Sequence, residues 1–522
     1  MSYIGIMAAL ATPRCLRRLR RDLAMVGPKW GPSVFAVRGD LPSENIVSET
    51  IDSALGGSEE RAPVFENPPK ATEKSATPTD LRVVRFFLLT LGALLVGYAF
   101  LGRGFAHLGV PPLYLGEFVL AFGLVATAVA VLRGRLQVPR SWLVIVLVVF
   151  MLLGAIDTVP YIPQYGTNAL RDATLWGYAI FALFIFALLD RDWVLKLFRL
   201  YGRVAILFLL WGPVAWWIFT TYTTPGPFGS STFFSNVIPN APGSGIPILF
   251  FKSQDMAVHT AGAIAYLVVG TPLVRRIRDF LWRLGAALPA AWLVYVTGSV
   301  TRGGLAAVAA SVGVLAAVAG RTRNWVPVAA GAVLFAAVLT SGIASPLIPS
   351  GQDERSLVNN IGSILGGPSD SQLQGTRNFR LQWWEKIVDY TVRGPYFWTG
   401  KGFGVNLADS DGFQVVSDDS LREPHNAHMS VLARMGVPGF LLWVLLQAGF
   451  ALLLLRALLV HRRAGDSQLA AVAAWILAFW MAIMVNTSFD PYLNGPQGGI
   501  WFWALFGLGL VVIRLVPRRQ AA

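Results

Sequence analysis

The chain has 522 residues, of which 54% are apolar and only 14% are charged. In ordinary soluble domains about a quarter of the residues are charged, so the composition excludes a soluble globular protein. The single cysteine excludes an intramolecular disulfide, and no cluster of Cys and His predicts a zinc site. The net charge of +14 does not predict nucleic-acid binding, because the basic residues gather in short loops between apolar segments.

Residues 1–81 are predicted to form a separate cytoplasmic tail. A cluster of arginines between Arg14 and Arg21 is followed by a tract rich in Ser, Pro, Glu and Thr. Because this composition cannot bury a core, we expect the tail to be disordered. The arginines could contact anionic lipids, but we favour a tail without a role. The apolar start precedes the charges, which argues against a signal peptide.

The rest of the chain predicts an all-α polytopic membrane protein, because apolar segments of membrane-spanning length follow one another. Spans one to nine are expected within 82–343, and spans ten to twelve within 426–522, together with the C-terminus. A large loop, 344–425, separates the two groups. The twelve predicted spans are 83–101, 112–132, 142–157, 172–189, 201–220, 256–273, 280–299, 304–320, 325–343, 429–455, 468–486 and 498–515.

The charges predict an orientation in the membrane. The loops after even-numbered spans are basic, whereas the short loops after odd-numbered spans hold few Lys or Arg. Basic loops stay in the cytoplasm, so both termini are predicted to be cytoplasmic. The loops 221–255 and 344–425 then face outward, and Arg302 lies at the outer end of span seven.

The step Thr301-Arg302-Gly303-Gly304 places an arginine at or near membrane depth. A guanidinium there is costly and is usually paired or functional. The glycines allow a backbone or a ligand to approach closely. Arg302 is therefore a candidate anion clamp, and an arginine that snorkels to the interface is the alternative.

An amphipathic helix is predicted over 375–390, within the outer loop. Arg380 and Trp384 share one stripe of it, and Arg377 precedes Arg380 by one turn. Two such arginines could hold a diphosphate, while a surface helix with solvated charges is the alternative. The tryptophans suit the headgroup zone, so the helix could lie on the membrane. The apolar face repeats at helical spacing through Phe379, Trp383 and Ile387.

A glycine-dense turn follows, Gly400-Lys401-Gly402-Phe403-Gly404. Its backbone N–H groups could face an anion, although the pattern is not that of a nucleotide-binding loop. Two local ion pairs are also expected near the outer surface. Lys252 could pair with Asp255, and Arg171 with Asp172.

His425 stands where the large loop re-enters the apolar region. Two of the chain's five histidines, His425 and His428, fall in this short stretch. An imidazole at a membrane surface is a candidate general base, and the residue types leave both histidines open. The plainer interpretation is that Asn426 caps the next helix. The element from Gly436 to Gly439 is predicted to break that helix after about two turns, as happens where helices line a cavity.

Together these motifs resemble the O-antigen ligase and polymerase superfamily, membrane glycosyltransferases of bacterial cell-surface polysaccharides. The resemblance covers about 82–515, and the order of the motifs is more specific than any one of them. Thr301 stands where the family has Ser. The matching elements are Thr301-Arg302-Gly303-Gly304, Arg380-Leu381-Gln382-Trp383-Trp384, the glycine turn at Gly400, and His425-Asn426 followed by Gly436 and Gly439.

The resemblance implies a donor glycan linked to undecaprenyl diphosphate and used on the periplasmic side of the bacterial inner membrane. It implies that Arg302 and Arg380 hold the diphosphate and that His425 acts on the acceptor hydroxyl, without a metal or other cofactor. We assign substrate binding also to Arg377, Trp384, Lys401 and Asn426.

The acceptor implied is a glycan or glycolipid, such as lipid A–core for a ligase or another carrier-linked repeat for a polymerase. The motifs do not separate these two enzymes. Membrane lipids and polysaccharide assembly proteins are the other expected partners, and nucleic acid is not expected. A transporter of lipid-linked glycans is a third interpretation. It is disfavoured because the outlying charges gather at the outer surface and not at the midplane.

Overall fold

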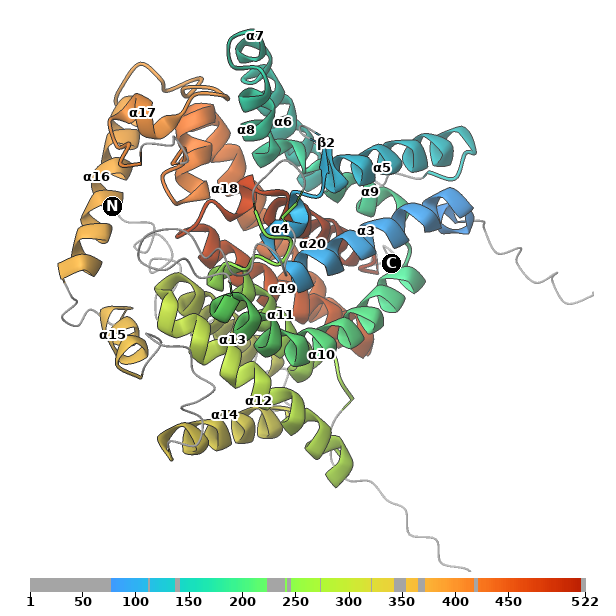
Figure 1. Cartoon of the computed structure of the whole chain (residues 1–522). Helices are drawn as coiled ribbons and strands as arrows, with labels where there is room; N and C mark the ends of the chain where they lie inside the picture. Colours follow the sequence, from blue (N-terminus) through green and yellow to red (C-terminus); the bar gives the residue numbers. More distant parts are fainter. Residues whose placement is uncertain are drawn as a thin grey trace, which may run out of the picture. The chain divides into compact units, whose positions relative to one another are not determined.

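The computed structural model describes residues 77–110, 113–136, 141–222, 240–241, 246–272, 274–320, 322–341, 354–364, 371–416 and 421–517 (Figure 1). Residues 1–76 of the expected tail lie outside the described residues. The described part is almost entirely helical. Its two short strands, β1 (Gly109–Val110) and β2 (Leu113–Tyr114), pair in antiparallel register.

The helices follow one another along the chain with few other elements between them. In the part of the chain that the structure describes, three short 3-10 helices occur, at Pro78–Asp80, Val159–Tyr161 and Tyr492–Asn494. The α-helices are α3 (Arg82–Leu101), α4 (Arg103–Ala106), α5 (Leu115–Leu132), α6 (Trp142–Ile156), α7 (Ile162–Tyr165), α8 (Thr167–Gly177), α9 (Ile180–Leu188), α10 (Arg191–Tyr222), α11 (Ser253–Val269), α12 (Ile277–Val300), α13 (Arg302–Ala319), α14 (Trp325–Thr340), α15 (Glu354–Ile364), α16 (Ser371–Val392), α17 (Leu407–Asp411), α18 (Ala427–Arg463), α19 (Ser467–Thr487) and α20 (Pro496–Arg514).

Each predicted span falls on a helix, and the fourth falls on α8 and α9, which are bent by 41°. Within the described residues, nine helices are long and apolar enough to cross a membrane, or ten if that bent pair counts as one span. Helix α14 is apolar but shorter. The chain is therefore a multi-pass helical membrane protein, and the number of twelve spans stays a prediction.

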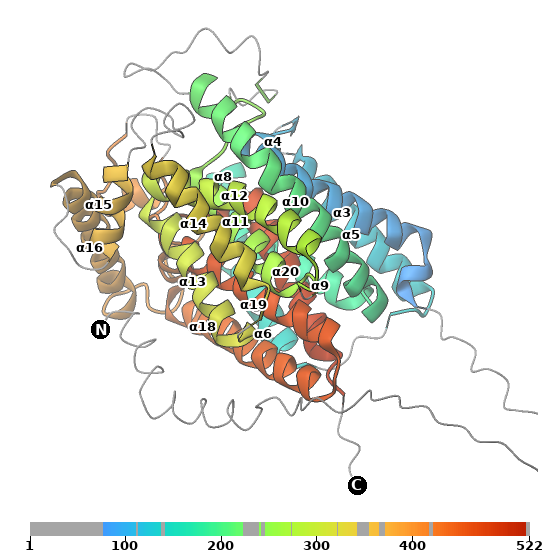
Figure 2. The ribbon, with the colours of Figure 1, turned by 90° about the horizontal axis from the view of Figure 1, so that it is seen from below.

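Helices α19 and α20 form the centre of the bundle. In their most apolar windows 78% and 83% of the residues are buried, against 28–44% in the other seven spanning helices. They pack against α9, α11, α13 and α18. Both ribbon views show them surrounded by other helices (Figures 1 and 2).

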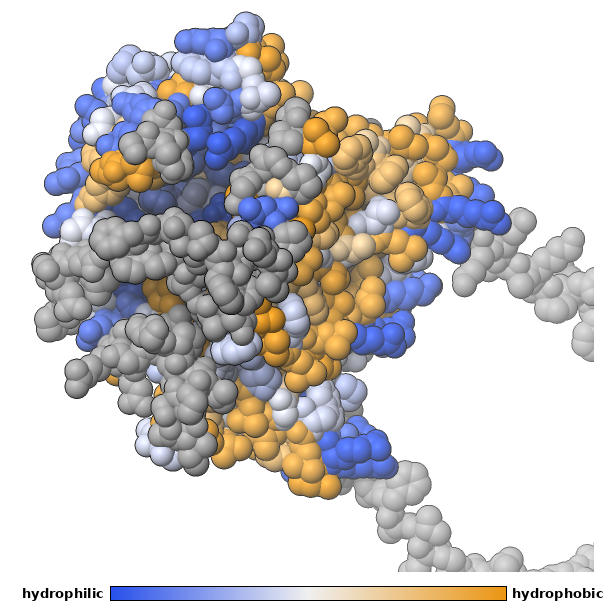
Figure 3. Space-filling model, viewed as in Figure 1, coloured by the Kyte–Doolittle hydropathy of each residue, from blue (hydrophilic) through white to orange (hydrophobic). Residues whose placement is uncertain are grey.

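The peripheral helices expose apolar side chains over a broad surface. Figure 3 shows this surface over α3 and α5, with hydrophilic residues gathered at the helix ends. A continuous apolar area of this kind, on helices of spanning length, is a lipid-facing surface. Its exposed side chains include Leu89, Phe122, Leu152 and Leu207.

Candidate functional site

A pocket of about 530 Å³ lies between α16 and the segment that leads into α18. Arg380 and His425 both line it, so the structure brings together two residues that are 45 positions apart in the chain. The lining also contains apolar side chains, among them Phe379, Val416 and Leu421.

The backbone of His425 is strained. Its φ is 51°, and no other non-glycine residue in the described ranges has a positive φ. This left-handed conformation is unfavourable for residues with a Cβ and persists only where the surroundings impose it. Strain of this kind clusters at functional sites, which makes His425 the prominent residue of the pocket.

Neighbouring contacts hold the strained segment on both sides. The Asn426 side chain is buried and accepts hydrogen bonds from the N–H groups of His428 (3.0 Å) and Met429 (3.2 Å). The expected helix cap is thus confirmed, and Asn426 fixes the start of α18. The indole Nε1 of Trp384 donates to the carbonyl oxygen of Pro424 at 2.9 Å. Through these contacts Asn426 and Trp384 position His425.

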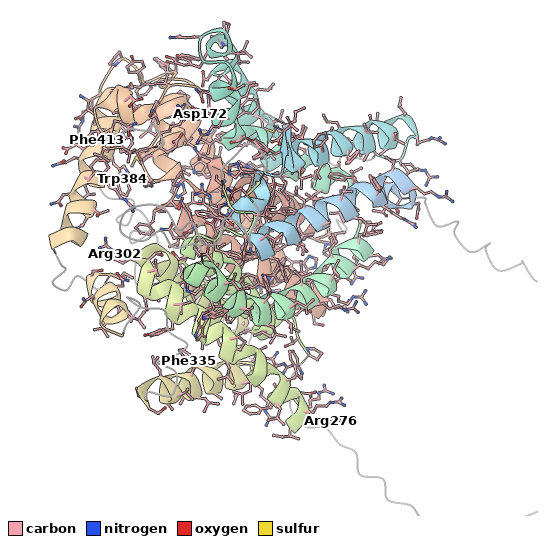
Figure 4. All side chains as sticks on the ribbon, in the orientation of Figure 1. Asp172, Arg276, Arg302, Phe335, Trp384 and Phe413 are labelled. Carbon is pink, nitrogen blue, oxygen red and sulfur yellow. The ribbon has the colours of Figure 1, made fainter. Side chains whose placement is uncertain are left out.

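Arg302 is the first residue of α13, and both helix ends beside it are capped. The Thr301 hydroxyl accepts from the N–H of Gly304 at 2.9 Å. The amide of Asn360, in α15, donates to the carbonyl oxygens of Gly298 and Ser299, each at 2.9 Å. The caps satisfy polar groups that the break between α12 and α13 would otherwise leave unpaired. They fix the place of Arg302, which Figure 4 labels together with Trp384.

The two glycines after Arg302 allow close packing, as the sequence predicts. A Cβ on Gly303 would lie 2.9 Å from Cβ of Phe489, and one on Gly304 would lie 3.0 Å from Cβ of Ala257. Such contacts are too short for ordinary packing. The start of α13 is therefore held against α11 and against the segment that carries Asp490.

The charges of the site act on one another. Burial lowers the pKa of Arg380, the carboxylate of Asp490 opposes this change, and the positive charge of Arg302 adds to it. Arg302 thus lies close enough to influence the ionisation of Arg380, although it does not line the pocket. Two such positive charges would favour an anion placed between them.

His425 is neutral near pH 7. Burial is the main cause that lowers its pKa to about 4. The cations Arg380 and Lys252 lower the pKa further, whereas Asp490 raises it. A neutral imidazole can accept a proton, which is the state that a general base requires.

Lys252 and Asp490 belong to the same charge cluster, which the sequence did not reveal. Lys252 Nζ lies 2.8 Å from a carboxylate oxygen of Asp490, whose side chain is 5% exposed. The expected pair of Lys252 with Asp255 is therefore wrong. Both residues flank predicted spans on the outer side of the membrane, the side on which Arg302 is predicted to lie. This shared placement was the only feature of the sequence that could have indicated their pairing.

His428 is held inside the helix bundle by hydrogen bonds. Its Nδ1 accepts a hydrogen bond from Nε1 of Trp443 at 3.0 Å, so the proton resides on Nε2, which faces the carbonyl oxygen of Met484 at 3.3 Å. The ring is buried within the helices and is absent from the lining of the pocket. Of the two histidines that the sequence left open, only His425 lines the pocket.

Arg377 and Lys401 do not line the pocket. Arg377 is exposed on α16. Lys401 Nζ binds the buried carboxylate of Asp411 at 2.5 Å and the hydroxyl of Ser410 at 2.6 Å. It also lies 4.3 Å from the ring centroid of Tyr390. The charge of Lys401 is thus neutralised inside the α16–α17 segment.

The glycine turn supports a broken helix. Gly436 has φ 61°, so α18 is interrupted where the sequence predicts. The N–H of Lys401 donates to the carbonyl oxygen of Ala433 (2.7 Å), and that of Gly402 to Arg434 (3.1 Å). These N–H groups satisfy carbonyls that the interruption exposes. The N–H of Gly404, at the end of the turn, donates to the carboxylate of Asp172 at 3.0 Å. The turn therefore meets an anionic side chain of the protein itself, and binding of a ligand anion there stays a prediction.

A buried ion network braces the segment before His425. Asp172 lies 3.1 Å from Arg422 and 3.0 Å from Arg434, and Arg434 lies 2.6 Å from Glu423. The expected local pair of Arg171 with Asp172 is therefore wrong. Because Arg422 and Glu423 stand just before His425, the network fixes the position of the segment that carries the imidazole.

The helix predicted over 375–390 buries its apolar face against other parts of the protein. Trp383 and Ile387 are fully buried in a cluster with Leu432 and Ala433 of α18. Their contacts with α18 hold Arg380 beside the segment that carries His425. Among the described residues, no three His, Cys, Asp or Glu side chains are placed to hold a metal ion.

Comparison with known proteins supports the resemblance seen in the sequence. The family model described as O-antigen ligase matches residues 285–444, which include Arg302, Arg380 and His425. No curated protein matches the chain significantly. A solved structure titled "Structural coordination of polymerization and crosslinking by a peptidoglycan synthase complex" is 19% identical, with a TM-score of 0.37. The alignment covers 72% of this chain and 98% of that one.

Proposed function

We propose that this membrane protein, whose residues 285–444 match the O-antigen ligase family model, is a glycosyltransferase of the O-antigen ligase type. It moves a preassembled glycan from undecaprenyl diphosphate to a hydroxyl of lipid A–core or a similar acceptor. The observation that carries the proposal is the shared pocket of Arg380 and His425, with Arg302 close enough to influence the ionisation of Arg380.

Arg302 and Arg380 bind the diphosphate of the donor. When the bond between the anomeric carbon and the diphosphate oxygen breaks, the electron pair stays on that oxygen and its negative charge grows. Fixed guanidinium groups stabilise this charge without having to reorganise. The apolar side chains of the lining, Phe379 and Leu421 among them, lower the local dielectric constant and strengthen the attraction.

His425 is the general base. As the acceptor hydroxyl attacks the anomeric carbon, its proton passes to the neutral imidazole, and the new glycosidic bond forms on the face opposite to the departing diphosphate. This single displacement inverts the anomeric configuration. The pKa of about 4 keeps the imidazole of His425 unprotonated at neutral pH, so its ring nitrogen can accept the proton of the hydroxyl during the attack. Trp384 and Asn426 are positioning residues for this imidazole.

The proposed reaction is independent of metal. The argument is the positive charge of the site itself, because Arg302 and Arg380 offer the diphosphate what a divalent cation would otherwise supply. Lys252 contributes less, since Asp490 neutralises it at 2.8 Å. We place the site on the periplasmic face of the bacterial inner membrane, with both termini in the cytoplasm, from the distribution of basic loops.

A polymerase of the same superfamily is the second candidate. It would use the same donor and the same residues, and it would differ only in taking another carrier-linked glycan as acceptor. A transporter of lipid-linked glycans is disfavoured. Transporters place their site near the bilayer midplane between related halves, whereas Arg302 and His425 both stand at helix starts.

The test is glycan transfer by the purified protein in detergent. Wild type and His425→Ala each receive undecaprenyl-diphosphate glycan, either with lipid A–core or with further donor alone. Product on lipid A–core that is lost in the variant supports a ligase. Lengthened carrier-linked glycan supports a polymerase. Full transfer by His425→Ala, or no product with either acceptor, contradicts the proposal.

A further inference from the structure

An apolar groove of about 340 Å³ shares no lining residue with the pocket of Arg380 and His425. Helices α3, α9, α10, α19 and α20 line it. Its floor reaches the centre of the bundle, where Trp475, Phe479 and Trp501 are buried. Its mouth lies beside Leu89 and Leu200, whose side chains are exposed on the lipid-facing surface.

The length of the groove matches one leaflet of a bilayer. Its lining on α3 runs from Leu88 to Val96, which is about 12 Å at the helical rise of about 1.5 Å per residue. The hydrocarbon core of a bilayer is about 30 Å thick, so one leaflet occupies about 15 Å. The groove thus suits one acyl chain, whereas a long isoprenoid would extend well beyond it.

One end of the groove carries a positive charge. Lys196 is the single charged side chain among the described residues that line the groove, and it is exposed. Its Nζ lies 5.1 Å from the ring centroid of Trp193, which also lines the groove. Tryptophan is typical of the headgroup zone. Both residues stand in the first turns of α10, at the end of the bundle that the basic loops assign to the cytoplasm.

We infer that this groove is a binding site for an anionic phospholipid of the cytoplasmic leaflet. One acyl chain lies in the groove against Trp475 and Phe479, and the headgroup phosphate meets the ammonium of Lys196. Trp193 marks the level of the glycerol region. The charge selects an anionic headgroup, and the length of the groove along α3 suits one acyl chain. This site is independent of the proposed transferase chemistry.

Gly92 provides a direct way to close the groove. It lines the groove on α3, and a Cβ built on it meets no atom within 4 Å. A larger side chain at this position can therefore extend into the groove without displacing a helix. Gly313, on α13, also has no atom within 4 Å of a built Cβ and does not line the groove. Leucine at Gly313 is thus a matched control for leucine at Gly92.

The experiment measures lipid retention. Full-length protein is purified in detergent, stripped of lipid, titrated with phosphatidylglycerol or phosphatidylcholine, and examined by native mass spectrometry. Wild type should retain one phosphatidylglycerol in preference to phosphatidylcholine. Lys196→Gln should lower the apparent affinity for phosphatidylglycerol about fivefold, as the loss of one cation near an anionic lipid predicts. Gly92→Leu should lose retention of both lipids.

Two controls keep the result specific. Gly313→Leu and Arg133→Gln, the latter changing an exposed arginine outside the groove, should bind like wild type. Equal affinity of Lys196→Gln and wild type for phosphatidylglycerol would overturn the inference, as would equal retention of the two lipids. Displacement of bound phosphatidylglycerol by equimolar undecaprenyl phosphate would also overturn it, because the groove would then hold the carrier. Lys196 is exposed, so its variant tests the inference even if Gly92→Leu fails to fold.

Discussion

The indole Nε1 of Trp384 donates a hydrogen bond to the carbonyl oxygen of Pro424 at 2.9 Å, immediately before the strained His425. This bond joins α16, which carries Arg380, to the segment that carries the proposed base. The cation that we propose to bind the donor and the imidazole that we propose to activate the acceptor are therefore held in fixed positions relative to each other. A change in this bond should affect the chemistry more than the fold.

Trp384→Phe removes the hydrogen bond and keeps an aromatic ring. We expect kcat to fall about tenfold or more, because a small displacement of the base weakens proton transfer. The free energy of unfolding should fall by only about 1 kcal/mol, the typical worth of one hydrogen bond. Transfer rates and thermal unfolding of the same preparation check this. An unchanged kcat would show that Trp384 does not position His425.

Arg434→Gln should destabilise the protein strongly. The side chain of Arg434 is fully buried and pairs with both Asp172 and Glu423. Removing one member of a buried ionic network leaves uncompensated charge and costs about 3–5 kcal/mol. Arg393 forms an exposed pair with Asp389, so Arg393→Gln should cost less than about 0.5 kcal/mol. Thermal unfolding compares the two variants, and equal melting temperatures would contradict the structural role of the network.

The activity should retain its full value at mildly acidic pH. Because the pKa of His425 is about 4, the acid limb of kcat/KM, which reports the free enzyme, should lie near pH 4 and not near 6.5. Lys252 lowers this pKa, so Lys252→Gln should move the limb to higher pH. A wild-type limb near pH 6.5 would contradict the assignment of His425.

The same shift predicts how stability depends on pH. The folded pKa of His425 lies below the unfolded value of about 6.5, so the unfolded chain binds the proton more readily. The contribution of His425 to stability should be complete above pH 6.5, should decline as the pH falls toward 4, and should change no further below that. The difference in melting temperature between wild type and His425→Gln, measured across this interval, checks the sign.

Lys401→Met should impair stability and leave the chemistry intact. Its ammonium neutralises the buried Asp411 and does not reach the pocket. We expect a lower melting temperature, since Asp411 would lose its partner. Transfer per folded molecule should stay within about twofold of wild type, because no interaction with the transition state is removed. A large fall in kcat without loss of stability would restore Lys401 as a substrate-binding residue.

Local patterns in the sequence predicted the helices well, because hydropathy depends on neighbouring residues alone. The break at Gly436 and the cap at Asn426 were predictable for the same reason. The eleven-residue helix α15 was not predicted. It is short and not strongly apolar, and its importance comes from the contact of Asn360 with the distant end of α12.

Pairing of charges could not be predicted from local sequence. Lys252 and Asp255 are close in the chain, yet Lys252 pairs with Asp490, because the ends of α11 and α19 meet in space. Lys401 looked available within a glycine turn, but its partner Asp411 is buried nearby. His425 and His428 were equivalent by sequence. Tertiary contacts alone distinguish the pocket imidazole from the one bound to Trp443.

The account depends most on the two arginines that would bind the diphosphate. The most direct measurement is the single-turnover rate of glycan transfer from undecaprenyl diphosphate by Arg302→Gln, Arg380→Gln and the exposed control Arg393→Gln. We predict that the first two fall by about 10²–10³, the usual effect of removing one group that stabilises developing negative charge. The control should stay near the wild-type rate. Wild-type rates for Arg302→Gln and Arg380→Gln, in normally folded protein, would contradict the account.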